Sequence, residues 1–341
     1  MKKIFLFLGL FILFYLVLNW NDILYGLLQL KGQLRVLGNS ATIEEALNSE
    51  SFPDSLKGNL KAISEIKSFV RDELGFAENS NYTTVYNQKG KNILWIVTAC
   101  PKFELKAYEW RFPLFGTFPY KGFFDLDKAF REEKKIKEQG YDTNIRSVSG
   151  WSTLGWFNDP ILSGMLEKSE GDLANTIIHE LTHSEVFVKD EIDLNENLAT
   201  FVGDYGALKY LERKYGKDHS TYFEYLNELE EEKGFTEYVI EGAKALDSLY
   251  NTFDDNIDST IKASSKREFI DRWVAEIDTL KFKSYRGFRS RALKDLPNNT
   301  FFMSYLRYNS MQNSFEQEYL SSENLSFKEY VDTLIKRYAE N

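Results

Sequence analysis

Two histidines placed four residues apart restrict the fold of this chain more than any other feature of its sequence. Segment 179–183 reads His-Glu-Leu-Thr-His, an H-E-x-x-H pattern, and the chain of 341 residues has only three histidines. Apolar residues recur at helical spacing before it, namely Leu173, Ala174, Ile177 and Ile178. This spacing predicts an amphipathic helix. Residues four apart share one face of a helix, so both imidazoles can reach a single metal ion.

A carboxylate on the next predicted helix can complete the set of metal ligands. Catalytic zinc takes three protein ligands and keeps a fourth position open. A helix is expected to begin at Asn195-Glu196-Asn197, which makes Glu196 the expected partner of His179 and His183. Glu180 projects beside the two imidazoles, where it can take a proton from the water that the ion activates. We therefore predict one zinc ion per chain, with Glu180 as the catalytic base.

Other residues near the motif offer alternatives. Four carboxylates lie closer to the motif than Glu196 does, in a charged segment expected to be a loop, and helices hold ligands more precisely than loops do. These are Glu185, Asp190, Glu191 and Asp193. The third histidine, His219, lies in a polar, turn-like stretch and is interpreted as a surface residue. The alternative to any metal site is a helical face whose histidines only hydrogen-bond their neighbours.

Several other segments of the chain, together with the motif, form a recognisable combination. Segment 150–160 (GWSTLGWFNDP) precedes it, and segment 195–200 (NENLAT) follows it. Earlier segments are Gly32-Gln33, 69–75 (FVRDELG), 112–116 (FPLFG) and 120–124 (YKGFF). On these residues, over roughly 30–215, the chain resembles the bacterial family of putative aminopeptidases. Members of that family look like zinc metallopeptidases of the gluzincin type.

The resemblance implies a fold and a set of roles. The implied fold is α+β, mainly α, of the zincin type, with a small β-sheet beside the motif helix and a helical C-terminal part. The implied zinc ligands are His179, His183 and Glu196, and the implied base is Glu180. An edge strand of the sheet would pair with the substrate backbone. Thr200 departs from the gluzincin pattern, in which an acidic residue four positions after the glutamate often orients a histidine.

Composition narrows the class of partner. The formal net charge is −10, from 52 acidic and 42 basic side chains. This argues against nucleic acid, whose binding needs a concentrated basic surface, but the charge does not specify the substrate. A peptide or protein substrate is what the family resemblance implies. Cys100 is the single cysteine, so no internal disulfide can form, and it is interpreted as a buried, inert thiol.

The N-terminus predicts attachment to a membrane. Met1-Lys2-Lys3 is followed by an uncharged apolar run from Ile4 to Leu18, which extends to Trp20 without a small-x-small cleavage site. We interpret residues 1–20 as an uncleaved signal anchor, with a cleaved signal peptide as the alternative. The lysines keep the N-terminus cytoplasmic, so the catalytic part is expected on the periplasmic or extracellular side of a bacterial cell membrane.

Periodicity and turn residues predict the remaining elements. Residues 93–99 and 143–148 are the expected strands, and 103–105 can pair beside the first. Predicted helices cover 23–37, 42–47, 56–74, 127–139, 222–229, 261–280 and 327–338. The expected division is the anchor 1–20, a catalytic region 21–216, and a helical part 217–341 that packs on it. Tyr120 and Tyr205 are the two candidates for stabilising a developing oxyanion.

These observations predict a membrane-anchored zinc peptidase, of the aminopeptidase type that the resemblance implies. Cleavage at the N-terminus or within a chain, the substrate sequence and the oligomeric state stay open at this point. The rival hypothesis is an inactive zinc-binding envelope protein that acts as a binding or scaffold module. A third is an anchored structural protein whose histidines bind no metal.

Overall fold

A computed structural model of the chain describes residues 14, 17–112, 116–148, 157–254, 256–277, 280, 292, 296–322 and 325–339. Most of the predicted anchor 1–20 lies outside these residues, as do residues 150–156 of the family segment. Within the described part of the chain, no helix combines the length and the apolar character needed to cross a bilayer.

Helices at the N-terminal end follow the predicted pattern. They are α2 (Trp20–Gly38), α3 (Ile43–Asn48), α4 (Asp54–Phe69) and the π-helical turn η1 (Val70–Leu74). A capping box begins α3, because Thr42 accepts from the Glu45 amide at 3.2 Å and the Glu45 carboxylate accepts from the Thr42 amide at 2.8 Å. Gly75 ends η1 with φ +78°, a left-handed conformation that glycine adopts without strain.

Strands form three small sheets. The central sheet has the order β6-β3-β7, and all of its pairs are antiparallel, with Val97 opposite both Lys121 and Ile145. A second sheet has the order β1-β2-β8, and β4 pairs with β5 as a hairpin. Their bounds are β1 (Ala41–Thr42), β2 (Thr84–Tyr86), β3 (Trp95–Pro101), β4 (Trp110–Phe112), β5 (Gly116–Phe118), β6 (Lys121–Phe123), β7 (Tyr141–Ser147) and β8 (Ile161–Leu162).

Both main strand predictions are confirmed, at β3 and β7, and the prediction for 103–105 is wrong. These residues form a turn and coil after Pro101, which has no amide to donate to a ladder. The Phe103 ring instead packs edge-on against Tyr250 and Phe253, at centroid distances of 6.2 and 5.8 Å. Burial of this ring in a helical cluster therefore replaces strand pairing.

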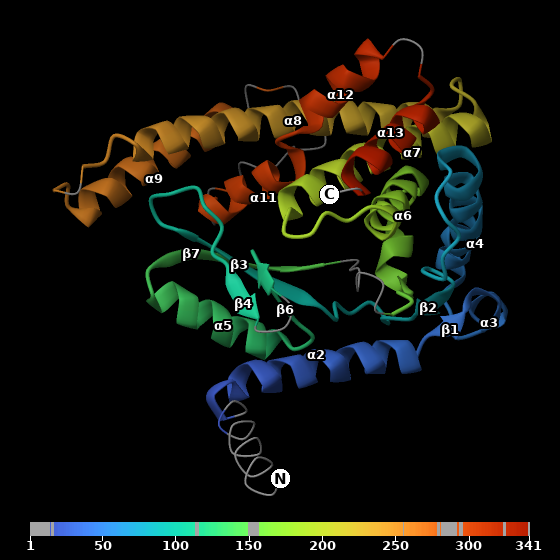
Figure 1. The fold of residues 1–341 in the computed structure, drawn as a ribbon, viewed down its shortest axis with the longest axis horizontal. Helices are drawn as coiled ribbons and strands as arrows, with labels where there is room; N and C mark the ends of the chain where they lie inside the picture. The colour runs from blue at the N-terminus through green and yellow to red at the C-terminus, as the bar shows by residue number, and fades with distance from the viewer. Residues whose placement is uncertain are drawn as a thin grey trace, which may run out of the picture.

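The remaining helices cover the sheet and form the rest of the molecule (Figure 1). In that view α8 and α2 lie on opposite sides, with the central sheet, α6 and α7 between them. After β8 the chain forms a 3₁₀ turn, η2 (Ser163–Glu167). The other helices are α5 (Leu126–Glu138), α6 (Glu170–Glu185), α7 (Ile192–Tyr215), α8 (Ser220–Tyr250), α9 (Ser259–Glu276), α11 (Asn299–Asn309), α12 (Gln312–Ser321) and α13 (Phe327–Ala339). The structure is thus mainly helical with small sheets.

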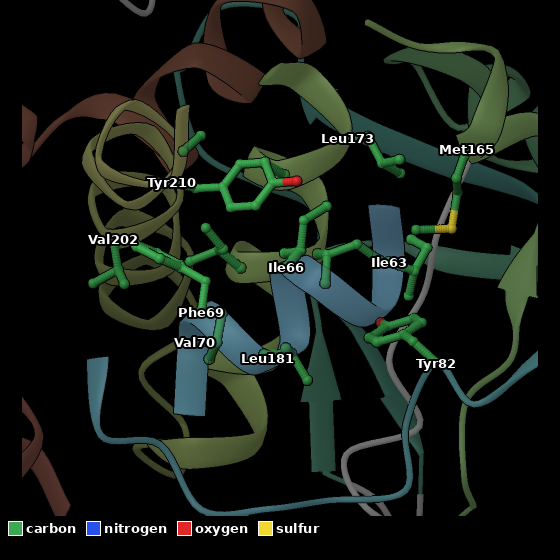
Figure 2. Packing of buried hydrophobic residues seen from close by; sticks show 14 of the residues in the cluster. Ile63, Ile66, Phe69, Val70, Tyr82, Met165, Leu173, Leu181, Val202 and Tyr210 are labelled. Atoms are coloured by element: carbon green, nitrogen blue, oxygen red, sulfur yellow. The ribbon is translucent and has the colours of Figure 1, made fainter. Parts of the chain in front are cut away.

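The largest hydrophobic cluster fixes α6 by its apolar face. Figure 2 shows Leu173 and Leu181 of α6 among Ile63 and Ile66 of α4 and Val202 of α7. Each of these side chains is at most 2% exposed. Because the apolar residues of α6 occupy one face of the helix, its polar residues, including the motif histidines, lie on the other.

Candidate metal centre

Two adjacent helices bring three potential ligands to one point. His179 and His183 come from α6 and Glu196 from the first turns of α7. The Nε2 atoms of the histidines lie 3.2 Å apart. Glu196 Oε2 lies 3.4 Å from Nε2 of His179 and 3.6 Å from Nε2 of His183. The predicted group of three is therefore assembled, and its atoms lie close enough together to hold one metal ion.

These spacings fit a tetrahedral zinc ion. Zn–N and Zn–O bonds of about 2.0–2.1 Å at tetrahedral angles place neighbouring ligand atoms about 3.3 Å apart. The side chains of His179, His183 and Glu196 are 16%, 9% and 15% exposed. Ligand atoms that converge at this spacing and are this well shielded from water can hold a small divalent cation.

The opposite charges of Glu196 and the two histidines offset the effect of burial on the pKa values of Glu196 and His183. Burial by itself would raise the pKa of Glu196, but its contacts with His179 and His183 hold that pKa well below its usual range. Burial by itself would lower the pKa of His183, and Glu196 outweighs this effect and raises it. A carboxylate held ionised between two imidazoles is ready to bind a cation, whether the cation is a proton or a metal ion.

Two buried asparagines hold Glu196 in place. Asn195 clamps the preceding loop, accepting from the Val188 amide at 2.8 Å and donating to the Val188 carbonyl at 2.7 Å. Asn197 donates to the Arg307 carbonyl at 2.6 Å and accepts from the Met311 amide at 2.8 Å. The Asn-Glu-Asn sequence therefore fixes α7 to a loop on one side of the ligand and to the α11–α12 region on the other. Nothing in the local sequence around Asn195 and Asn197 indicates this role, because their partners lie in a loop and in helices far along the chain.

Glycines allow α6 and α7 to approach closely. A Cβ atom at Gly203 would lie 3.1 Å from the Asn175 carbonyl oxygen and 3.3 Å from the His179 Cβ. A Cβ atom at Gly206 would lie 3.1 Å from the Ile178 side chain. These positions face α6 on the same side as the motif, so small residues there set the helix spacing that brings Glu196 within reach of the histidines.

The rival carboxylates lie elsewhere. Glu185 accepts from the Ala77 amide at 3.0 Å, and the Asp193 side chain is 64% exposed, 3.4 Å from Nε of Arg307. Asp190 and Glu191 are exposed residues between the two helices.

The third histidine, His219, is exposed too; it accepts from the Thr221 amide at the start of α8 and stacks on the Tyr215 ring at 4.6 Å. Its interpretation as a surface residue is confirmed.

Two tyrosines border the centre. The Tyr308 ring lies 6.4 Å from the His179 ring, centroid to centroid. Burial, followed by the carboxylate of Glu196, raises the pKa of Tyr308 to about 12. The same causes raise the pKa of Tyr120 above its usual range, with Tyr308 and Glu180 contributing. Both hydroxyls thus keep their protons close to the carboxylates of Glu196 and Glu180. Tyr308 was not among the residues predicted from the sequence.

Tyr205, the other predicted oxyanion candidate, is placed differently. Its hydroxyl donates to Glu316 of α12 at 2.7 Å, and its ring packs on Phe201 and Tyr319. Nine residues separate it from Glu196 on α7, which is two and a half helical turns, so the two side chains project from opposite faces. Helical geometry therefore removes Tyr205 from the centre.

A polar network extends from the centre along α6. Asn175, one helical turn before His179, donates to Asp204 at 2.6 Å and to the Tyr225 hydroxyl at 3.0 Å. Burial raises the pKa of Asp204 to about 8. Lys168 donates to Thr176 at 2.7 Å, and burial lowers its pKa although nearby carboxylates, including that of Glu180, oppose this. These side chains continue the polar face of α6 away from the two histidines.

Cys100 lies in β3 and is 1% exposed. Burial raises the pKa of its thiol to about 12, so the thiol stays protonated at neutral pH. The prediction that Cys100 is buried is confirmed, and the interpretation of its thiol as inert stays a prediction.

Fold and site together define a mainly helical protein that carries a His-His-Glu centre on two packed helices, an arrangement capable of binding a divalent metal. Residues 25–340 match the family described as putative aminopeptidases, and the chain belongs to that family. The predicted family is thereby confirmed, and the match extends through the C-terminal helices. Searches of curated proteins and of solved structures found no match. The family description indicates peptidase activity.

Proposed function

We propose that the protein is a membrane-anchored zinc peptidase whose ion is held by His179, His183 and Glu196. The observation that carries this proposal is the convergence of their three ligand atoms at separations of 3.2 to 3.6 Å. Family membership supports the narrower statement that the peptidase is an aminopeptidase. When bound, zinc supplies Lewis-acid activation of water and of the scissile carbonyl.

Glu180 serves as the general base. It follows His179 on α6, and its carboxylate interacts electrostatically with Tyr120, Tyr308 and Lys168. It takes the proton of the attacking water and transfers it to the departing amine. A base on a buried helix keeps a fixed position relative to the two histidines, which suits a proton transfer in both directions.

Tyr308 and Tyr120 are the proposed donors to the developing oxyanion. Their raised pKa values mean that each hydroxyl holds a proton at neutral pH, as a donor must. Tyr308 is fixed because its neighbour Arg307 is bound through its carbonyl to Asn197, next to the Glu196 ligand. One buried asparagine thus orients both a zinc ligand and an oxyanion donor.

The proposed division of the chain follows the sequence analysis. Residues 1–20 anchor the chain in a bacterial cell membrane and the remainder acts on peptides outside the cytoplasm. Residues 21–216 carry the three ligands and the base. Residues 217–341 pack on this region and contribute Tyr308 from α11.

A peptide-library digest tests the proposal. Purified full-length protein, loaded with zinc, is incubated with the library in the presence and absence of a chelator, and cleavage sites are read by mass spectrometry. We expect chelator-sensitive loss of N-terminal residues. Glu180→Gln is the matched variant, expected to keep about one zinc per chain and to lose activity by about 10²–10⁴-fold. Zinc without turnover of any peptide would refute the peptidase and favour the scaffold hypothesis; full turnover by zinc-loaded Glu180→Gln would refute the mechanism.

A further inference from the structure

Helix α2 exposes an apolar face to solvent. Its large apolar side chains that point outward are about half exposed: Trp20 58%, Leu24 42%, Leu27 56%, Leu30 44% and Leu34 52%. Three of them, Trp20, Leu24 and Leu27, follow the spacing i, i+4, i+7 of one helical face. An exposed apolar helical face of this kind on a folded protein marks an interaction site.

The opposite face of α2 is the one that packs on the protein. Tyr25 donates to the Gly122 carbonyl of β6 at 2.9 Å and stacks on Phe112 of β4 at 5.4 Å. Val36 is buried, and a Cβ atom at Gly32 would overlap the Phe124 ring. At 100° per residue, Tyr25, Gly32 and Val36 lie on the side of the helix away from Trp20 and Leu27. The outward face of α2 therefore takes no part in these contacts with β6 and β4.

Charged residues lie within and beside the apolar face, with Lys31 on the same side of the helix as Trp20 and Leu24. Lys31 and Arg35 of α2 and Lys128 of α5 line a hollow of about 190 Å³ beside it, together with Asp125. Cations next to an apolar helical face match the boundary of a lipid bilayer, where acyl chains meet phosphate groups. Trp20 at the start of the helix also suits that boundary.

Exposed apolar side chains also precede α2 in the sequence. Phe14, Val17 and Leu18 are 62%, 65% and 66% exposed. They belong to the uncharged apolar run from Ile4 to Leu18 that leads directly into α2. The exposed face is thus continuous in sequence with the segment proposed as the membrane anchor, which identifies lipid as the partner that covers it.

We propose that α2 lies flat on the bilayer surface, with Trp20, Leu24, Leu27 and Leu34 inserted at the boundary between headgroups and acyl chains. This inference extends the proposed membrane attachment and is independent of the peptidase chemistry.

The contact would orient the metal centre relative to the membrane. The Tyr25 hydroxyl ties α2 to Gly122 of β6, and Tyr120, one of the two tyrosines that border the centre, immediately precedes that strand. The hydrogen bond attaches α2 to β6, and the stacked ring attaches it to β4. Docking of α2 on the bilayer would therefore orient the metal centre relative to the membrane.

A fluorescent label at single cysteines tests the proposal in the full-length chain. Leu27→Cys and Leu34→Cys are labelled in a Cys100→Ser background with an environment-sensitive dye and reconstituted into phosphatidylethanolamine–phosphatidylglycerol vesicles, with or without brominated acyl chains. The matched control is Phe223→Cys on α8, an exposed apolar position at 48%. We expect the labels at 27 and 34 to shift to the blue and to lose most of their emission to brominated lipid, and the label at 223 to do neither.

Two results would overturn the proposal. Labels at 27 and 34 that remain in water, as at 223, would show that α2 does not contact lipid. Labels that shift to the blue without quenching, together with cysteine cross-links between chains at position 27, would show that a second copy covers the face. Thermal unfolding in detergent shows whether each variant is folded. The readouts need no peptidase activity, so a failed digest and a failed docking experiment remain distinguishable.

Discussion

Nε2 of His179 and Nε2 of His183 lie 3.2 Å apart, with their rings at 86° to each other. At this distance one protonated and one unprotonated nitrogen can share a hydrogen bond, and two unprotonated nitrogens can both bind one cation. The third atom of the group, Oε2 of Glu196, lies 3.4 Å from the first nitrogen and 3.6 Å from the second. The metal proposal depends on this triangle and on the residues that keep it rigid.

Asn197 is the residue that most directly supports the Glu196 ligand. Asn197→Ala removes hydrogen bonds to the buried Arg307 carbonyl and to the partly buried Met311 amide. We expect a loss of about 2 kcal/mol or more in the free energy of unfolding and a fall in zinc affinity of about 10–100-fold. Urea unfolding and chelator competition measure the two effects. Asn251→Ala, at an exposed position on the C-cap of α8, is the control; equal effects in both variants would contradict the assigned role.

Tyr308 is the stronger of the two oxyanion candidates, since its ring is 6.4 Å from that of His179. Tyr308→Phe keeps the ring and removes the hydroxyl, so kcat should fall by about 10–10³-fold with little change in bound zinc. Tyr205→Phe removes a hydroxyl bound to Glu316 on the far face of α7 and should leave kcat within about twofold of the wild type. Steady-state kinetics on one peptide compare them, and a reversed order would exclude Tyr308.

The raised pKa of Asp204 predicts that the free energy of unfolding depends on pH. Burial raises the pKa of its carboxyl from 3.8 to about 8 in the folded chain. The unfolded chain therefore ionises at lower pH than the folded one, and the stability present below about pH 4 is lost progressively as the pH rises toward 8. Asp204→Asn does not titrate and can still accept from Asn175. Its melting temperature should exceed that of the wild type by a margin that grows from about pH 5 to about pH 8. A margin that shrinks with rising pH would show the opposite sign.

Local sequence patterns predicted the parts of the site that depend on helical periodicity. The motif helix follows from the spacing of Leu173, Ile177 and their neighbours, and the choice of Glu196 over loop carboxylates follows from its place on a second helix. The strands β3 and β7 follow from their apolar and β-branched residues. Helical periodicity also predicts the position of Tyr205, because it lies nine residues after Glu196 and so projects from the opposite face of α7.

Other parts of the site depend on long-range packing that periodicity does not encode. Tyr308 reaches the centre because Arg307 is bound by Asn197 across 110 residues of sequence. Asp204 and Tyr225 meet through Asn175, so three helices share one network. Phe103 lies outside the sheet, and its ring packs on Tyr250 and Phe253, which are far away in the sequence. The division into regions 21–216 and 217–341 stays a prediction.

The most direct measurement is the zinc content of purified protein compared with two single variants. After loading and removal of free metal, we expect about one zinc per wild-type chain and per Glu191→Ala chain, since Glu191 is an exposed carboxylate between α6 and α7. Glu196→Ala should bind zinc at least tenfold more weakly and retain almost none. A wild-type protein without zinc, or a Glu196→Ala variant that binds it as tightly as the wild type, would contradict the proposed centre.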